Sequence, residues 1–284
     1  MNIGIVGNGF VGGATSLFET RSSPYDINVI IYDKDTKKRS PINVRLEDFL
    51  SCDLVFVCIP TPMNDDGSCH VSIVNDCVLD LVKVGVNNSN IIVRSTVPVG
   101  FCESLGVSFM PEFLTEKNWK NDYKNNNLWI FGLYDKNDEK LKLKIRGLIG
   151  IAHKESKIDH NNISFCSSGE AEMVKLARNA FLATKVSFFN EVYDFCQLKN
   201  LDFGIVSDLV GVDVRIGKSH TIVPGPDGKR GFGGTCLPKD LSSLYYQMNE
   251  AGMESFIVEA VLARNTHVDR KDRDWALDKG RAVV

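Results

Sequence analysis

The glycine-rich stretch near the N-terminus limits the possible folds more than any other feature of the chain. Residues 7–12, Gly-Asn-Gly-Phe-Val-Gly, follow a short apolar run at 2–6 and precede an apolar segment at 14–18 that is typical of a helix. A second apolar run, at 29–32, ends at Asp33. Strand, glycine turn, helix and second strand in this order form the βαβ unit of a dinucleotide-binding domain. The sequence therefore predicts an N-terminal Rossmann-like α/β domain with a parallel sheet.

Each position of this pattern has a separate role. We expect Gly7 to permit the tight turn, Gly9 to let the backbone approach the pyrophosphate, and Gly12 to pack the helix against the strand. Asp33 lies 21 residues beyond Gly12, where a carboxylate binds the ribose hydroxyls and repels a 2′-phosphate. The pattern favours NAD over NADP; the alternative is a glycine turn in an α/β domain that binds no nucleotide. The residues expected to contact NAD here are Gly7, Gly9, Phe10, Val11, Gly12 and Asp33.

Three more apolar runs continue the βα rhythm, at 54–59, 91–93 and 107–110. The first is continuously apolar, as in strands that are buried on both faces of a parallel sheet. Polar residues follow the runs: Thr61, Thr96, Glu112 and Glu116. Because the carboxyl ends of parallel strands meet at one edge of the sheet, where ligands bind, we expect these residues to lie at the same edge.

The second half of the chain has a helical pattern. Residues 170–203 contain neither glycine nor proline, and apolar residues recur at helical spacing. A helix of about 30 residues is roughly 45 Å long, more than one small domain covers, so we expect part of its apolar surface to meet a second subunit. The alternative is a core helix covered by helices at 241–251 and 254–266. Lys175 and Asn179 share one face because they lie four residues apart.

One cysteine follows a second glycine-rich stretch. Pro238-Lys239-Asp240 is typical of the first turn of a helix, so Cys236 is expected near a helix N-terminus, where the dipole and free N–H groups favour a thiolate. Gly233 and Gly234 remove side chains, so a ligand or backbone can approach closely. Such a thiol can hold an acyl group covalently until water releases it. The alternative is a buried structural cysteine beside a tight turn.

Composition excludes several classes of protein. The chain has 284 residues, of which 43% are hydrophobic, and a formal net charge of −3, which suits two globular domains and offers no basic stripe for nucleic acid. The cysteines and histidines lack zinc-ligand spacing, so we expect no metal site. No apolar stretch approaches the roughly 18 residues of a membrane span, and the N-terminus has no signal-like segment. We expect a cytoplasmic protein with reduced thiols.

The stretch at 231–240, Gly-Phe-Gly-Gly-Thr-Cys-Leu-Pro-Lys-Asp, resembles the active-site signature of the UDP-glucose/GDP-mannose dehydrogenase family. Further segments that resemble the family are 59–62, 95–100, 111–114, 175–181, 213–217 and 220–226. The resemblance implies a Rossmann-like domain followed by an all-helical domain on a long connecting helix. It also implies NAD-dependent, four-electron oxidation of a nucleotide sugar's primary alcohol to a carboxylate, with UDP-glucose to UDP-glucuronate as the expected reaction, in a homodimer.

The resemblance further implies what single residues do. Cys236 would trap the aldehyde as a thiohemiacetal that is then oxidised to a thioester. Lys175 and Asn179 would stabilise the alkoxide or oxyanion. Asp240 would position the hydrolytic water or act with it as base, and Glu116 would be a general base for thioester hydrolysis. The implied catalytic residues are Cys236, Lys175, Asn179, Asp240, Glu116 and Thr96, the last of which would help to hold water.

Binding residues follow from the same segments. The implied NAD contacts beyond the first glycine turn are Pro60, Thr61, Ser95, Thr96 and Lys239. The implied substrate contacts are Glu112, Phe113, Leu114, Thr115, Glu116, Lys175, Asn179, Arg215, Gly233 and Cys236. Arg215 would reach the nucleotide sugar from the neighbouring subunit. One departure concerns Lys117-Asn118-Trp119, where relatives usually have glycine or another small residue in a loop that touches substrate.

Members of the family generally continue into a third α/β domain that binds the nucleotide of the sugar substrate. Residues 276–284 read like the linker and first strand of that domain, and we expect a naturally short protein. The predicted organisation is an NAD domain at 1–166, a helical dimerisation domain at 167–270 and a remnant linker at 271–284. Two alternatives stay open: a two-electron dehydrogenase of the 3-hydroxyacid or 6-phosphogluconate type, and a binding protein without catalytic activity.

Overall fold

The computed structural model describes residues 1–21 and 24–284 and divides into two compact units. The first unit consists of residues 1–61 and 71–175, and the second of residues 62–70 and 176–284. The domain boundaries at 166 and 270 that the sequence indicates stay predictions.

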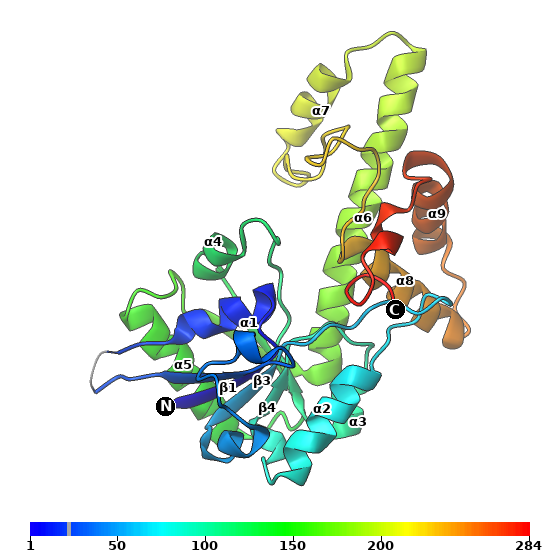
Figure 1. Ribbon diagram of the computed structural model, residues 1–284. Helices are drawn as coiled ribbons and strands as arrows, with labels where there is room; N and C mark the ends of the chain where they lie inside the picture. Colours follow the sequence, from blue (N-terminus) through cyan, green and yellow to red (C-terminus); the bar gives the residue numbers. More distant parts are fainter. Residues whose placement is uncertain (22–23) are drawn as a thin grey trace. The chain divides into compact units, whose positions relative to one another are not determined.

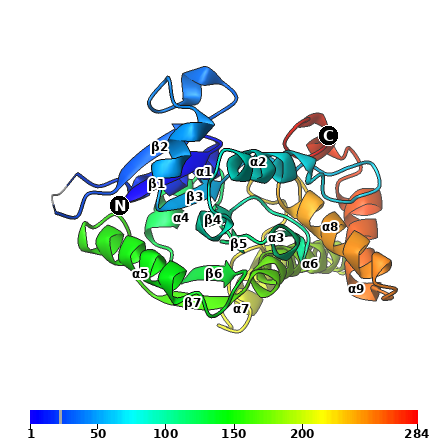
Figure 2. The same ribbon diagram turned by 90° about the horizontal axis from the view of Figure 1, so that it is seen from below.

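Within the described residues of the first unit, a seven-stranded sheet has the order β2-β1-β3-β4-β5-β6-β7 (Figure 2). Neighbouring strands run parallel except for the antiparallel pair β5–β6. The strands are β1 (Asn2–Val6), β2 (Asn28–Tyr32), β3 (Leu54–Val57), β4 (Ile91–Val93), β5 (Ser108–Phe109), β6 (Trp129–Leu133) and β7 (Ile163–Ser167). The expected Rossmann-like domain is therefore confirmed, and the antiparallel pair β5–β6 within the sheet is a feature that the sequence did not indicate.

Helices cover both faces of this sheet. Side chains of β3 alternate between two cores: Leu54 and Phe56 join one, and Val55 and Val57 join the other. The helices of the first core are α1 (Phe10–Thr15), α4 (Trp119–Lys124) and α5 (Glu139–Lys154). The second core includes α2 (Ser72–Lys83) and α3 (Phe101–Leu105). Burial on both faces explains why β3 is apolar at every position.

The helix α6 (Ser168–Leu198) begins in the first unit and continues through the second (Figure 1). Its 31 residues match the predicted helix of about 30 residues. The other helices of the second unit are α7 (Phe203–Gly211), α8 (Leu237–Glu250) and α9 (Phe256–Arg264), and a π-helical turn, Asn265–Asp269, follows α9 directly. Leu176, Leu241 and Val261 pack α6, α8 and α9 into one core, so the expected helical second part is confirmed.

Residues 62–70 belong to the second unit, although the residues before and after them in the chain belong to the first. Met63 pairs with Cys69 across the turn and with Val283 near the other end of the chain. The Met63 N–H donates to the Ala282 carbonyl at 2.9 Å, and the Val284 N–H donates to the Met63 carbonyl at 3.0 Å. The second unit is thus assembled from two separate stretches of chain.

Within the same described residues, no helix is long and apolar enough to cross a membrane. In the part of the chain that the structure describes, no three or more His, Cys, Asp or Glu side chains are grouped so that they could hold a metal ion.

Candidate active site

The fingerprint loop, residues 7–12, adopts the conformation that its glycines permit. Gly7 has φ = +92°, and a Cβ on Gly12 would lie 1.9 Å from the Gly7 carbonyl oxygen. Larger residues would therefore force the turn and α1 apart. A Cβ on Gly9 would meet nothing within 4 Å, so the backbone at the start of α1 is open to a ligand. This loop fits the pyrophosphate of a dinucleotide.

Asp33 follows β2 and lies beside the fingerprint loop. One carboxylate oxygen accepts the Asn8 N–H at 2.7 Å, and the other accepts the Asp35 N–H at 2.9 Å. These bonds fix the carboxylate where a ribose is expected. The neighbouring Arg39 donates to the Asp33 carbonyl at 2.8 Å and packs over the Tyr32 ring at 4.2 Å. Its guanidinium is thus engaged by the protein at the position where NADP-binding domains use an arginine.

Two loops at the carboxyl edge of the sheet are joined by hydroxyl groups. Ser95 Oγ accepts the Ile59 N–H at 3.0 Å and donates to the Ile59 carbonyl at 2.7 Å. Thr61 Oγ1 donates to the Thr96 carbonyl at 2.7 Å. The structure therefore brings the predicted residues after β3 and β4 together.

Glu112 and Lys175 form a buried ion pair in the first unit. Lys175 Nζ donates to the Glu112 carboxylate and to the Glu112 carbonyl, both at 2.7 Å. Lys175 is 3% exposed and Glu112 is 6% exposed. The Leu114 N–H donates to the second carboxylate oxygen of Glu112 at 2.9 Å. Removing one partner would leave an uncompensated buried charge. Glu116, in contrast, is exposed further along the same loop.

Glu172 is a functional candidate that the sequence analysis did not single out. It is fully buried at the start of α6 and accepts the Gly100 N–H at 2.6 Å and the Cys102 N–H at 2.8 Å. It holds the segment after Thr96 against the helix that carries Lys175. Burial raises the pKa of this carboxyl, and the two backbone bonds oppose that rise. Its spacing of three residues from Lys175, on the same helix face, was a usable signal.

In the second unit, Asp240 joins two predicted residues. Asn179 Nδ2 donates to one of its carboxylate oxygens and Lys239 Nζ to the other, both at 2.5 Å. Burial opposes the charge on Lys239, but the Asp240 carboxylate and the thiols of Cys69 and Cys236 outweigh burial and raise the pKa of Lys239. Cys236 immediately precedes α8, as expected. The Lys239 ammonium thus lies in the electrostatic surroundings of the Cys236 thiol, and it is paired with Asp240, to which Asn179 also bonds.

The thiol loop, residues 230–236, differs from the expectation at Gly233. A Cβ there would lie 2.5 Å from Cζ of Arg270. The space that the missing side chain leaves is therefore taken by the protein's own guanidinium, whereas a Cβ on Gly234 (φ = +72°) would meet nothing within 4 Å. The predicted subunit-crossing residue Arg215 is highly exposed and pairs with Asp213.

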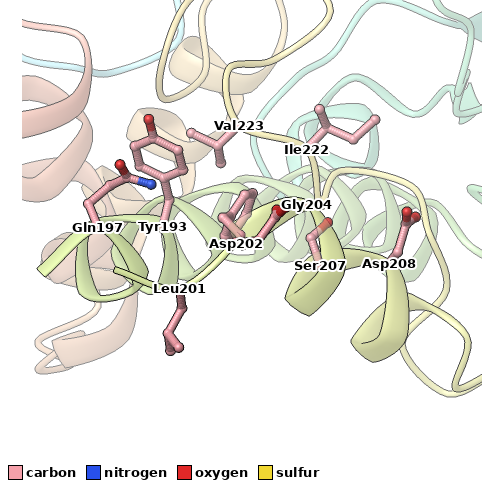
Figure 3. A pocket seen from close by; sticks show the side chains of 10 residues that line it. Tyr193, Gln197, Leu201, Asp202, Gly204, Ser207, Asp208, Ile222 and Val223 are labelled. Carbon is pink, nitrogen blue, oxygen red and sulfur yellow. The ribbon is translucent and has the colours of Figure 1, made fainter. Parts of the chain in front are cut away.

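A hollow of about 460 Å³ lies elsewhere in the second unit, where the end of α6 meets α7 (Figure 3). Its lining residues are Tyr193, Gln197, Leu201, Asp202, Phe203, Gly204, Ser207, Asp208, Ile222 and Val223. None of the predicted site residues belongs to this lining, so the chemistry is not assigned to this hollow.

Two family models match the chain. The model of the UDP-glucose/GDP-mannose dehydrogenase family, NAD binding domain, matches residues 39–148. The model of the central domain of the same family matches residues 169–267. The first match agrees with the cofactor predicted from the fingerprint loop and Asp33, and NAD is the cofactor of this domain.

Curated relatives carry matching names. A UDP-glucose 6-dehydrogenase of Pseudomonas aeruginosa is 32% identical over 238 residues, covering 77% of this chain and 49% of that protein. A UDP-glucose 6-dehydrogenase of Rickettsia bellii is 28% identical over 305 positions, covering 93% of this chain and 67% of that protein. The chain thus spans between about half and two thirds of the length of these relatives.

Solved structures agree on the fold. A UDP-glucose dehydrogenase from Pyrobaculum islandicum has a TM-score of 0.77 at 23% identity, over 94% of this chain and 68% of that one. A 3-hydroxyisobutyrate dehydrogenase from Mycobacterium tuberculosis has a TM-score of 0.69 at 17% identity, over 99% of this chain and 96% of that one. At these identities the likeness concerns the fold alone.

Proposed function

Because the chain belongs to the UDP-glucose/GDP-mannose dehydrogenase family, we propose that it oxidises the primary alcohol of a nucleotide sugar to a carboxylate, with UDP-glucose as substrate and UDP-glucuronate as product. The observation that carries this proposal is the position of Cys236 directly before α8, beside the Lys239–Asp240–Asn179 chain. A two-electron alcohol oxidation needs no thiol, whereas a four-electron oxidation uses one to hold the carbonyl carbon between its two oxidations.

The chemistry assigns work to named side chains. Two NAD molecules, bound one after the other, would each accept one hydride, one for each oxidation. Lys175 and Asn179 stabilise negative charge on the substrate oxygen as the alcohol loses a hydride and a proton. The Cys236 sulfur then bonds to the aldehyde carbon, and the thiol proton passes to the aldehyde oxygen. Loss of a hydride from that carbon and of the proton from its oxygen leaves a thioester.

Hydrolysis then frees the enzyme. Water adds to the thioester carbon, the carbon–sulfur bond breaks, and one water proton returns to sulfur as the carboxylate forms. Asp240 positions this water, Glu116 serves as general base, and Thr96 helps to hold the water. The Asp240 carboxylate is buried and accepts two hydrogen bonds, which supports a positioning role. The Glu116 carboxylate is exposed, which supports the exchange of protons with solvent.

A direct test offers the protein UDP-glucose, UDP-N-acetylhexosamines and GDP-mannose separately with excess NAD. We expect two NADH per UDP-glucose consumed, with the uronate identified by mass spectrometry. One NADH per sugar and an aldehyde or ketone product would contradict the thioester route. Tight NAD binding without turnover on any sugar would instead support a binding protein.

A two-electron dehydrogenase is the second candidate. The buried Lys175 and Asn179, four residues apart on α6, favour it because alkoxide stabilisation alone suffices for one hydride transfer. The number of NADH formed per substrate separates the two candidates: the first forms two, and the second forms one and leaves Cys236 without a chemical role.

We also propose a homodimer that uses the apolar side of α6. Phe181, Phe188 and Phe195 recur every seven residues along this helix and are 68%, 58% and 57% exposed. Exposed apolar side chains that recur along one side of a long helix are typical of a helix–helix interface. Light scattering is expected to give twice the chain mass at micromolar concentration, and Phe188→Glu to give the monomer. Leu143→Glu, at an exposed leucine of α5, is the matched control and should stay dimeric; a monomeric wild type would end the proposal.

A further inference from the structure

The backbone of the thiol loop is held by a side chain from a distant helix. Asn265 Oδ1 accepts the Phe232 N–H at 2.9 Å, and Asn265 Nδ2 donates to the Phe232 carbonyl at 2.9 Å. One amide therefore satisfies both backbone polar groups of the residue four positions before Cys236. Asn265 is only 2% exposed, so neither bond competes with water.

The glycines of the loop leave room for this contact. A Cβ on Gly231 would lie 2.3 Å from Asn265 Oδ1, and Gly231 has φ = +64°. Arg270, which fills the space at Gly233, donates its backbone N–H to the Asn265 carbonyl at 2.8 Å. The loop thus packs on two side chains from the π-helical turn and the residue after it. Irregular helical turns of this kind often occur at functional sites.

Asn265 also interrupts an apolar pattern. It lies in helical register with Val258, Val261 and Leu262, which pack in or against the core of the second unit. A polar group at such a position costs stability unless its partners are present. Because both partners belong to Phe232, whose ring is itself buried in that core, this residue is fixed by its ring and by its backbone.

Four residues then lead from this fixed point to the thiol. Phe232 is one end of the span, and the first turn of α8, with the buried Pro238, is the other. A short segment between two fixed ends has few conformations. The Asn265 amide thus holds one end of this short segment.

We propose that Asn265 is a positioning residue for the Cys236 thiol, acting through the backbone of Phe232. Its activity readout rests on the proposed four-electron reaction. Loss of the two hydrogen bonds between Asn265 and the Phe232 backbone lets the loop move, and a displacement of about 1 Å at a reacting atom can cost on the order of a hundredfold in rate. The second oxidation requires the thiol and the first does not, so the two steps separate a positioning role from a general loss of folded protein.

The test compares Asn265→Ala and Asn265→Asp with Ser207→Ala, which removes a buried hydrogen bond to the Thr221 carbonyl in the same unit. We expect NADH per sugar to fall from two toward one in Asn265→Ala, with aldehyde captured by semicarbazide, and to remain at two in the control. Asn265→Asp keeps the acceptor for the Phe232 N–H and should fall between them. An unchanged ratio in Asn265→Ala would overturn the proposal.

A second readout does not depend on turnover. Hydrogen exchange of the amides at 231–236 is expected to accelerate at least about tenfold in Asn265→Ala, while α6 and α8 stay protected as in the control. Exchange that is unchanged, or that accelerates throughout the second unit, would overturn the positioning role. If wild type consumes no sugar but this local effect is present, the proposed reaction is wrong and the role of Asn265 in positioning the thiol loop is supported. If Asn265→Ala does not fold, the same two measurements on Asn265→Asp decide the proposal.

Discussion

The fingerprint loop and the thiol loop are both glycine-rich, but they are held in different ways. The fingerprint loop is fixed by two backbone bonds and one carboxylate: the Gly7 N–H donates to the Tyr32 carbonyl and the Gly13 N–H to the Gly9 carbonyl, both at 2.8 Å, and the Asn8 N–H donates to Asp33 at 2.7 Å. The thiol loop is fixed by side chains. Asn190 accepts the Gly231 N–H at 3.2 Å, Asn265 holds Phe232, and Arg270 occupies the space at Gly233.

This difference affects how each loop responds to substitution. A backbone-held turn tolerates changes at most side chains, provided that its glycines remain. A loop held by buried amide and guanidinium groups depends on each of those groups, because removing one leaves an unsatisfied partner. The thiol loop therefore carries the reactive side chain, and its conformation is the more sensitive of the two to substitution of the residues that hold it.

The largest effect should come from the reactive side chain itself. Cys236→Ala is expected to lower acid formation by on the order of a thousandfold or more, because the acyl group has no point of attachment. Cys236→Ser should replace the thioester with a more stable ester, which intact-protein mass spectrometry at saturating UDP-glucose detects as added mass. Cys77→Ala, on α2, is the control. Full activity of Cys236→Ala would show that the thiol has no role in the reaction, and the two loops would then differ only in how they are held.

The second effect concerns a side-chain anchor in the first unit. Lys175→Met leaves the Glu112 carboxylate buried and unpaired, so the free energy of unfolding should fall by about 3–5 kcal/mol. Urea denaturation measures this change, and Lys175→Met with Glu112→Gln should recover part of it. Lys218→Met removes an exposed pair with Asp208 and should cost less than about 1 kcal/mol. Equal losses in the two single variants would show that burial of the Lys175 pair has no energetic consequence.

Cofactor preference tests whether the fingerprint loop acts with Asp33 as one site. NAD should bind at least about tenfold more tightly than NADP, which corresponds to about 1.4 kcal/mol, because the Asp33 carboxylate repels a 2′-phosphate. Calorimetry with both dinucleotides measures the ratio. Asp33→Ala should reduce the ratio of NAD affinity to NADP affinity. Asp35→Ala, at the start of the following short helix, should leave this ratio unchanged. Equal affinities in wild type would show that Asp33 is not the ribose ligand.

The smallest effect is a dependence of stability on pH. Burial raises the pKa of Glu172 above its usual 4.5, so the folded state binds the proton more tightly than the unfolded state. The resulting stabilisation is present below about pH 4.5 and is lost as the pH rises through the folded-state pKa. Glu172→Gln lacks this term, so wild-type stability should decline relative to the variant between pH 4.5 and neutral. A constant difference in urea unfolding across that range would exclude the shift.

Local patterns predicted much of the molecule from the sequence. Glycine positions, apolar runs and the spacing of Asp33 define a βαβ unit within a few dozen residues, and helical periodicity defined α6. The ion pair of Lys175 with Glu112 and the bond of Asn179 with Asp240 join residues that the sequence had already selected. The assigned roles of those residues in catalysis stay predictions.

Other features had no local signature. Asn190 and Arg270 are single polar residues whose importance comes from what they contact after folding. Asn265 offered one signal, a polar residue in an apolar register, but nothing in the sequence identified Phe232 as its partner. The antiparallel placement of β6 beside β5 likewise depends on pairing across the sheet rather than on the composition of either strand.

The pairing of Met63 with Ala282 and Val284 has a consequence for biosynthesis. The chain passes between the units at three places, near residues 61, 70 and 175, so a single proteolytic cut cannot release either unit whole. At ribosomal rates of about 5–20 residues per second, Met63 emerges roughly 10 to 45 s before residues 282–284, with which it pairs. The first unit can fold during that interval while residues 62–70 remain unpaired with residues 282–284, and the second unit gains this pairing only after residues 282–284 have been made.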